Sequence, residues 1–133
     1  MNKLLCADRF RTYSITQLCR EFSCTARALR FYEDQGLLAP RRRQMQRVYS
    51  YKDRARLRLV VQGRSVGLSL AEIRHLLETY DDQGEAAQNM LALRLFRQRL
   101  DALRTESSQI DTAIDTLSQA IAHLSSERTT AAA

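Results

Sequence analysis

Residues 25–40 read TARALRFYEDQGLLAP, and this stretch decides the fold. Thr25 is a typical N-cap residue, because its hydroxyl can accept a hydrogen bond from the first turn of a helix. The apolar positions that follow recur at helical spacing, namely Ala28, Leu29 and Tyr32. Gly36 is the residue type that often follows a helix C-terminus. The stretch therefore predicts a helix from Ala26 to about Gln35.

A second short helix is predicted immediately before this one. Thr16 is placed to cap a helix over residues 17–22, which would bury Leu18, Cys19 and Phe22. Ser23 and Cys24 leave only a tight turn before the next helix. Two short helices joined by such a turn form the helix-turn-helix pattern.

The segment after Gly36 is predicted to be an extended hairpin. Pro40 disfavours a helical conformation in the residue before it. Three arginines follow at positions 41–43, and the alternation of polar and apolar residues through Arg47-Val48-Tyr49 ends in residues that favour strands. We expect a two-stranded wing over residues 38–49, with its tip near residues 44–46.

Two further helices are indicated by capping boxes. The sequences SYKD at 50–53 and SLAE at 69–72 open helices that should end near residues 64 and 80. The residues expected to face the core are Leu57, Val60, Val61, Leu70, Ile73, Leu76 and Leu77. Residues 81–84 are predicted to be a short linker. These elements form a first domain over residues 13–80.

From about Glu85 a single long helix is predicted to reach about Ser126, so that the second domain is residues 85–126 and residues 1–12 and 127–133 are flexible termini. Its apolar residues alternate at spacings of four and three, which is the a/d pattern of a coiled coil. The seam consists of Phe96, Leu100, Leu103, Ser107, Ile110, Ile114, Leu117, Ile121 and Leu124. A helix of roughly 40 residues reaches about 60 Å, which exceeds the first domain. The stripe either packs back on that domain or, as we expect, forms a dimer interface with a second chain.

Positive charge is concentrated in the first part of the chain. Residues 1–80 carry 16 Lys and Arg against 7 Asp and Glu, and residues 81–133 carry 5 against 8, which gives the 133 residues a net charge of +6. A small basic domain joined to a mildly acidic helix indicates a polyanionic partner, of which nucleic acid is the simplest. With no apolar run of bilayer-spanning length and no signal peptide pattern, we expect a cytoplasmic protein.

The segments LRFYE at 29–33, GLLAP at 36–40 and RVY at 47–49 resemble the MerR family of bacterial transcription regulators. The order of the predicted elements matches that family too, so the resemblance covers roughly residues 13–126. It implies a mainly α fold, in which a winged helix-turn-helix head precedes a long helix that forms an antiparallel coiled coil in a homodimer. It also implies that each head lays its second helix in the major groove of a promoter palindrome. Many members distort promoter DNA, which makes RNA polymerase an expected partner and the bacterial nucleoid the expected location.

The resemblance and the predicted elements together indicate a set of DNA-binding residues. They are Thr25, Arg27, Arg30, Phe31, Tyr32, Arg41, Arg42, Arg43, Arg47 and Tyr49. Arg27 lies in the first turn of the recognition helix, where bidentate contact to a guanine is favoured, although a phosphate contact is the alternative. Arg30 and Tyr32 match family positions that hold phosphates or buttress the helix. Family wings usually carry glycine near the tip, whereas this one has Gln44-Met45-Gln46, which leaves the tip geometry open.

Neither a cofactor nor a metal site is expected. Metal-sensing members of the family place cysteines at the start of the dimerisation helix and beyond it, but the cysteines here are Cys6, Cys19 and Cys24. We expect free thiols, with Cys19 in the core and Cys24 favoured as a thiolate beside a helix N-terminus.

The sequence offers no nucleophile–base pair that would indicate an enzyme. The signal to which the protein responds is unknown. An organic effector would suit a crevice between the fourth helix and the partner's coiled coil, lined by Leu76, Leu77, Tyr80 and the apolar side of residues 90–96. The alternative is that these residues simply pack the head onto the coiled coil. The alternative to a transcription regulator is a coiled-coil interaction module with a basic head.

Overall fold

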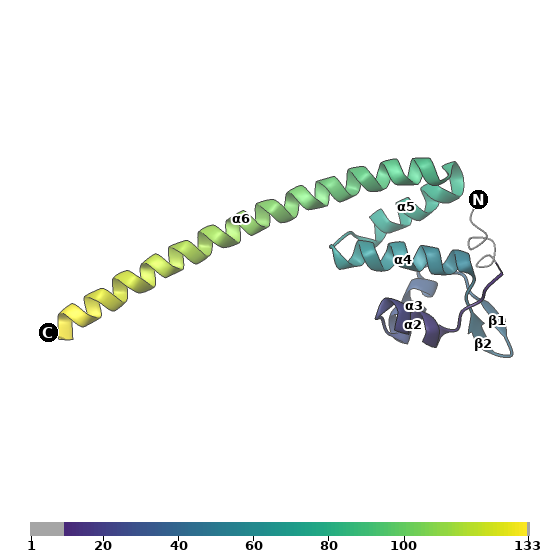
Figure 1. Ribbon diagram of the computed structural model, residues 1–133, viewed down its shortest axis with the longest axis horizontal. Helices are drawn as coiled ribbons and strands as arrows, with labels where there is room; N and C mark the ends of the chain where they lie inside the picture. Colours follow the sequence, from purple (N-terminus) through teal and green to yellow (C-terminus); the bar gives the residue numbers. More distant parts are fainter. Residues whose placement is uncertain (1–9, 133) are drawn as a thin grey trace. The chain divides into compact units, whose positions relative to one another are not determined.

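The computed structural model describes residues 10–132, so the prediction for Cys6 lies outside the described residues. The elements follow one another as α2 (Ile15–Phe22), α3 (Ala26–Asp34), β1 (Arg41–Arg43), β2 (Gln46–Val48), α4 (Tyr51–Ser65), α5 (Leu70–Gln83) and α6 (Glu85–Ala132) (Figure 1). They divide into two compact units, one up to Ala92 and one from Leu93 onward. A helix-turn-helix, a small β-hairpin wing and a long last helix confirm the predicted fold class.

The ends of α2 and α3 follow from local hydrogen bonds. The hydroxyl of Ser14 accepts from the Gln17 amide at 3.1 Å, and the Gln17 side chain accepts from the Ser14 amide at 2.8 Å. The prediction of Thr16 as the cap was therefore wrong, because this reciprocal pair starts the helix earlier. Thr25 caps α3 as predicted, with its hydroxyl 3.1 Å from the Ala28 amide.

A glycine at positive φ ends α3 and turns the chain toward the wing. Gly36 has φ of 73°, and its amide donates to the Glu33 carbonyl at 2.9 Å. The next amide, that of Leu37, donates to the Tyr32 carbonyl at 2.9 Å. This pair of bonds is the Schellman motif, which glycine adopts without steric cost.

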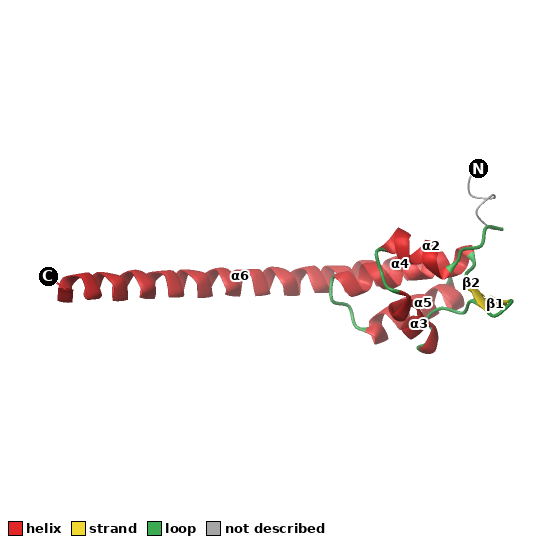
Figure 2. Cartoon of the chain, turned by 90° about the horizontal axis from the view of Figure 1, so that it is seen from below, coloured by secondary structure: helices red, strands yellow, loops and turns green. Residues whose placement is uncertain are grey.

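The wing is shorter than predicted. Its antiparallel strands, coloured yellow in Figure 2, pair Arg41 with Val48, Arg42 with Arg47 and Arg43 with Gln46. The two residues between the strands, Gln44 and Met45, have φ of 51° and 65°. Two consecutive positive φ angles in a two-residue hairpin loop are typical of a type I′ turn. A separate bridge between Tyr13 and Tyr49 ties the base of the wing to the chain before α2.

The N-termini of α4 and α5 lie where the capping boxes predict them, with Ser50 and Ser69 as the N-caps. The two helices approach closely at Gly63. A Cβ atom there would meet the Ile73 side chain at 3.0 Å, so the Ile73 side chain would have to shift to admit a larger residue. The close approach explains why a glycine is kept inside α4.

The last turn of α5 and its join to α6 differ from the prediction. Residues 81–83 belong to the helix, which ends only where Gly84 donates its amide to the Tyr80 carbonyl at 2.9 Å. Asp81, expected in a linker, instead forms ion pairs with Arg56 at 3.0 Å and Lys52 at 3.5 Å. These two bonds to α4 stabilise the additional helical turn.

The core of the head lies where α2, α3, the wing and α4 meet. Its buried residues are Tyr13, Leu18, Leu29, Leu38, Tyr49 and Leu57. The buried apolar residues from Val60 to the first turns of α6 are Val60, Leu68, Ile73, Leu76, Leu77 and Leu91. Leu70 was expected among them but is only half-buried, because it opens α5 at the surface.

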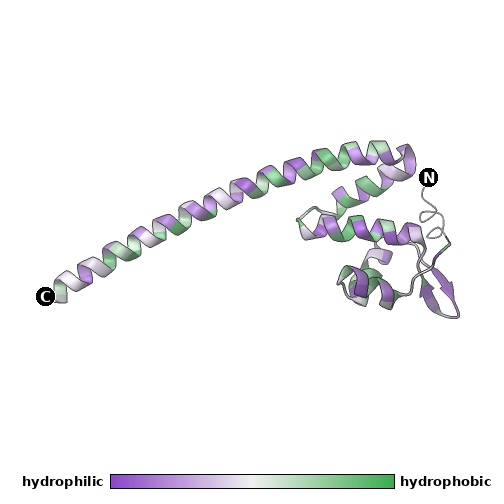
Figure 3. Ribbon diagram, viewed as in Figure 1, coloured by the Kyte–Doolittle hydropathy of each residue, from purple (hydrophilic) through white to green (hydrophobic). Residues whose placement is uncertain are grey.

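From Leu93 onward, α6 carries alternating apolar and polar bands (Figure 3). The exposed large apolar residues of the predicted seam are Leu100, Leu103, Ile110, Ile114, Leu117, Ile121 and Leu124. The helix continues to Ala132, beyond the end predicted near Ser126. Within residues 10–132, no helix is both long and apolar enough to cross a membrane.

Candidate nucleic-acid interface

One face of α3 is free to contact a ligand. Arg27, Arg30 and Phe31 lie three and four residues apart, so they share this face, and all three are exposed. On the other side of the helix, Leu29 is buried in the core. The helix is thus anchored by one face and presents two arginines and an aromatic ring on the other.

The remaining two α3 residues of the predicted set have structural roles. Thr25 is exposed, but its hydroxyl already accepts the hydrogen bond that caps the helix. Tyr32 is half-buried and packs against the core of the head. Its ring centroid lies 5.9 Å from that of Phe31, so it supports the exposed ring from behind.

The wing presents positive charge on both of its faces. Arg41, Arg42 and Arg43 are exposed, and successive strand residues point to opposite faces. Arg42 lies opposite Arg47 in the register, while Arg41 and Arg43 occupy the other face. Such a ribbon can contact phosphates with either face.

Arg47 ties the wing to α3 through an ion pair with Glu33. Its Nε donates to Glu33 Oε2 at 2.6 Å, and the two side chains are about equally shielded from solvent. The hydrogen bond to Glu33 holds the pKa of Arg47 above its ordinary value. Arg47 thus positions the wing, and a phosphate contact by its other guanidinium nitrogens stays a prediction. The partner, Glu33, was missed because its place opposite the wing depends on the hairpin register.

Tyr49 was predicted to bind DNA, but the structure places it in the core. It is 0% exposed, and its hydroxyl has no hydrogen-bond partner among residues 10–132. Burial raises the pKa of Tyr49 above its ordinary value. A residue that solvent cannot reach does not contact a phosphate, so we remove Tyr49 from the candidate interface.

A second ion pair fixes α2 against α4. Arg54 donates from Nε to both carboxylate oxygens of Glu21 at 2.9 Å. The hydrogen bond from Arg54 lowers the pKa of Glu21 below its ordinary value. The Arg54 guanidinium also lies over the Tyr13 ring, 5.5 Å from its centroid. These contacts hold α2 and the residues before it on α4.

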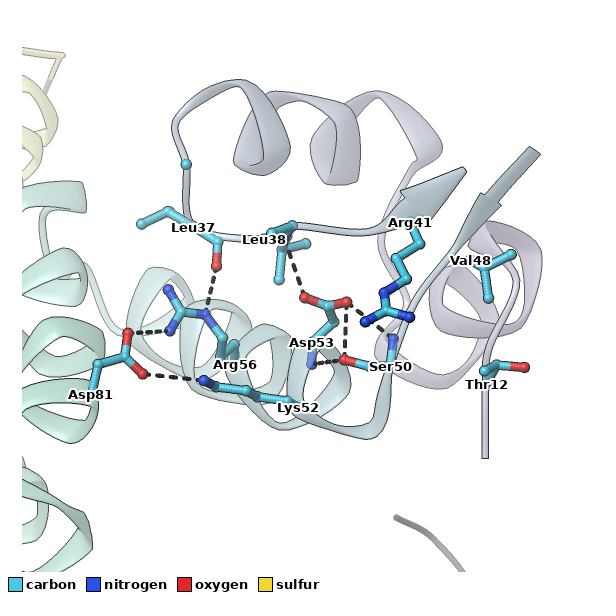
Figure 4. Close-up of a pocket in the computed structure, with 12 residues that line it drawn as sticks. Thr12, Leu37, Leu38, Arg41, Val48, Ser50, Lys52, Asp53, Arg56 and Asp81 are labelled. Atoms are coloured by element: carbon cyan, nitrogen blue, oxygen red, sulfur yellow. Dashed lines mark hydrogen bonds and ion pairs between the residues drawn. The ribbon is translucent and has the colours of Figure 1, made fainter. Parts of the chain in front are cut away.

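A pocket of about 510 Å³ opens beside the base of the wing, and Figure 4 shows the side chains that line it. Several of its polar groups have partners within the chain. Arg56 donates to the Leu37 carbonyl at 2.8 Å and to Asp81 at 3.0 Å, while Asp53 accepts from the amides of Ala39 and Ser50. These hydrogen bonds fix the segment between α3 and the wing against α4.

The environment of Cys24 disfavours the thiolate predicted for it, because it raises the pKa of the thiol. Burial raises the pKa of Cys24 above its ordinary value, and the neighbouring Cys19 raises it further. Desolvation thus outweighs the helix N-terminus on which the thiolate prediction rested. The part of the chain that the structure describes holds no group of three or more His, Cys, Asp or Glu side chains arranged to take a metal ion.

The residues predicted to line an effector crevice differ in their exposure within the single chain. Leu76 and Leu77 are buried within the head itself, whereas Tyr80 is exposed. The Leu76 carbonyl accepts a hydrogen bond from the Gln88 side chain at 3.1 Å, which joins α5 to the first turns of α6. Leu76 and Leu77 therefore take part in packing, as the alternative prediction for them has it.

Comparison with known proteins supports the resemblance found in the sequence. The family described as "MerR HTH family regulatory protein" matches residues 13–80, and that described as "MerR, DNA binding" matches residues 54–120. The HTH-type transcriptional regulator HmrR of Rhizobium leguminosarum bv. viciae is 30% identical over 95 residues, which cover 71% of this chain and 67% of HmrR.

Two further proteins show how much of the chain resembles known regulators. The HTH-type transcriptional regulator CueR of Salmonella typhi is 34% identical over 71 residues, or 52% of this chain, and the match spans only 51% of CueR. A solved structure described as HiNmlR, a MerR family regulator lacking the sensor domain, bound to promoter DNA, has a TM-score of 0.61 at 24% identity, covering 79% of this chain and 80% of that one. This second likeness shows a shared fold.

The family match at residues 13–80 takes in both helices of the helix-turn-helix, the wing, α4 and most of α5. The second match continues into α6. The members of the matched MerR family are transcription regulators, which agrees with the expectation that the chain is not an enzyme. The chain therefore belongs to the MerR family of helix-turn-helix transcription regulators.

Proposed function

We propose that this protein binds promoter DNA as a homodimer and regulates transcription from it. The observation that carries the proposal is the juxtaposition of two basic surfaces in one head. α3 presents Arg27 and Arg30 beside Phe31, and the wing presents its three β1 arginines. The Glu33–Arg47 ion pair joins these two surfaces, so they approach a duplex together. The same chemistry would serve an interaction module poorly, because an acidic protein partner needs no helix and wing in register.

The two surfaces suit different tasks on DNA. A recognition helix directs the residues near its N-terminus at base edges. Arg27 is in that position, and a guanidinium can donate two hydrogen bonds to guanine O6 and N7. Arg30 is one turn farther along, where a phosphate contact is expected. The wing arginines would neutralise phosphates and release counterions, which contributes affinity without sequence preference.

The exposed seam of α6 supports an antiparallel homodimer. Seven large apolar side chains along one stripe of a single chain are exposed to water, and a second copy of the chain would cover them. The stripe is self-complementary when the second helix runs in the opposite direction. Phe96 would then face Ile121, Leu100 would face Leu117, Leu103 would face Ile114 and Ser107 would face Ile110, each of the second copy.

Charges beside the seam favour the same register. In that alignment Arg104 lies next to Asp111 of the second copy, and two-fold symmetry forms this pair twice. Sliding one helix by a heptad in either direction would place Arg104 against its own counterpart, or Asp111 against its own. Opposite charges at positions that flank the core select the partner and the register.

In this proposal the dimer acts at a promoter palindrome in the bacterial cytoplasm and distorts the DNA that RNA polymerase must engage. The two cysteines that the structure describes, Cys19 and Cys24, do not suit a thiolate-bound metal as its signal, because both belong to the packed helix-turn-helix and burial raises the pKa of Cys24. The family and the promoter-bound fold neighbour support action on promoter DNA.

The test is selection of duplexes from a random-sequence pool by the purified full-length chain. The proposal predicts enrichment of an inverted repeat, which reports two heads related by a two-fold axis. Enrichment of a single unrepeated element would contradict the dimer. Binding of all duplexes alike, lost as salt rises, would contradict sequence-specific regulation.

A further inference from the structure

The tip of the wing combines backbone strain with an exposed apolar side chain. Gln44 and Met45 have φ of 51° and 65°, the left-handed region that glycine and asparagine occupy more easily. Met45 is also 92% exposed, so burial in the head does not offset the strain of its backbone conformation. A flexible, apolar side chain is thus held at the end of the hairpin although folding would favour glycine.

The surroundings of Met45 indicate what it would contact. The strand that leads into the turn is Arg41–Arg43, and the residues that flank Met45 are Gln44 and Gln46. Three exposed arginines next to the tip attract a polyanion, which disfavours an apolar protein surface as the partner. The Gln46 side chain, at the start of β2, can donate to the acceptors on base edges and sugars. An apolar tip between cationic and amide side chains therefore fits a nucleic-acid groove.

We propose that Met45 enters the minor groove of the duplex beside the segment that α3 contacts; this inference rests on the proposed function. The wing is fixed to α3 through the Glu33–Arg47 ion pair, so a helix in the major groove carries the wing to the neighbouring backbone and groove. The β1 arginines hold the phosphates at the groove walls. The thioether of Met45 packs against the sugars and base edges between them.

Methionine is suited to this role by its chemistry. Its unbranched side chain adapts to irregular surfaces, and proteins that bend DNA through the minor groove use apolar side chains, methionine among them, as wedges. Since each head of a dimer carries one wing, two such contacts would form on each duplex. They would favour sequences whose minor groove admits the side chain and whose base steps bend easily.

The turn itself offers a matched pair of variants. Met45→Gly and Gln44→Gly each replace one residue at positive φ by glycine, so both relieve strain and both should unfold at the same temperature as the wild type or higher. Only Met45→Gly removes the apolar tip. Affinity is measured for both on the duplex that the wild-type chain selects from a random pool. We expect about a tenfold loss for Met45→Gly, from partial burial of one methionine in each head, and no loss for Gln44→Gly.

A chemical change in the groove identifies the contact. Replacing adenine by 2,6-diaminopurine beneath the wings adds an amino group to the minor groove and leaves the major-groove edge unchanged. This duplex should bind the wild type more weakly but should bind Met45→Gly as the unmodified duplex does. Equal affinity of Met45→Gly and the wild type, or an equal penalty from diaminopurine in both, would overturn the inference. If the wild type enriches no duplex at all, the proposed function fails as well, which distinguishes the two results.

Discussion

Replacing Ile114 and Leu117 together by aspartate should dissociate the dimer. In the single chain these residues are 55% and 62% exposed, and the proposed interface would bury that surface. Complete burial of such a side chain contributes about 1.5–3 kcal/mol, so the buried fraction is worth about 1–2 kcal/mol for each residue. With two residues in each of two copies, the loss is about 4–8 kcal/mol before the cost of desolvating aspartate is added. The dissociation constant should therefore rise by roughly three orders of magnitude or more.

Sedimentation equilibrium over a range of protein concentrations measures this change. The matched control is Thr112→Asp with Gln119→Asp, which adds the same charge to the same helix at exposed positions away from the seam. The control should sediment as a dimer at concentrations where the seam variant is monomeric or aggregated. A seam variant that stays dimeric would refute the assigned interface and the antiparallel register with it.

Three further predictions test the head. Tyr49→Phe should leave DNA affinity unchanged and raise the free energy of unfolding by up to about 1 kcal/mol in denaturant titration, because it removes a buried hydroxyl without a partner; a loss of affinity would return Tyr49 to the interface. Arg54 lowers the pKa of Glu21 below 4.5, so their pairing stabilises the head above that pH and is lost as the pH falls through the lowered pKa. The melting temperature should hence fall more steeply in acid for the wild type than for Glu21→Gln, and parallel curves would show that the pair contributes nothing. Arg27→Ala should relax preference at one base pair of each half-site, at about 1–3 kcal/mol per contact, whereas Arg43→Ala should weaken all sequences alike and flatten the salt dependence; identical behaviour of the two would make Arg27 a phosphate contact.

Local chemistry explains which elements could be predicted from the sequence. Thr25, Ser50 and Ser69 cap helices as expected, since capping involves residues only a few positions apart. The same locality explains the error at Ser14 and Thr16, because both residue types are good caps. There the choice depended on the Gln17 side chain, whose reciprocal bond was overlooked.

Features set by long-range contacts were not predictable in the same way. The additional turn of α5 depends on the Arg56–Asp81 ion pair, which spans two helices. The role of Arg47 depends on a carboxylate in another element, and the burial of Tyr49 depends on the bridge that Tyr13 makes across the base of the wing. Residue type and spacing identified the basic surfaces, but they did not show which of the charges were already paired within the chain.

Hydroxyl-radical footprinting of the selected duplex tests the central claim most directly, since the claim is that two heads in a symmetric dimer hold one piece of DNA. The account predicts two protected segments of equal extent, related by a two-fold axis and centred about one helical turn, or a multiple of it, apart. Protection at the minor-groove sugars beneath the wings should accompany them. A single protected segment, or uniform weak protection along the whole duplex, would contradict the account.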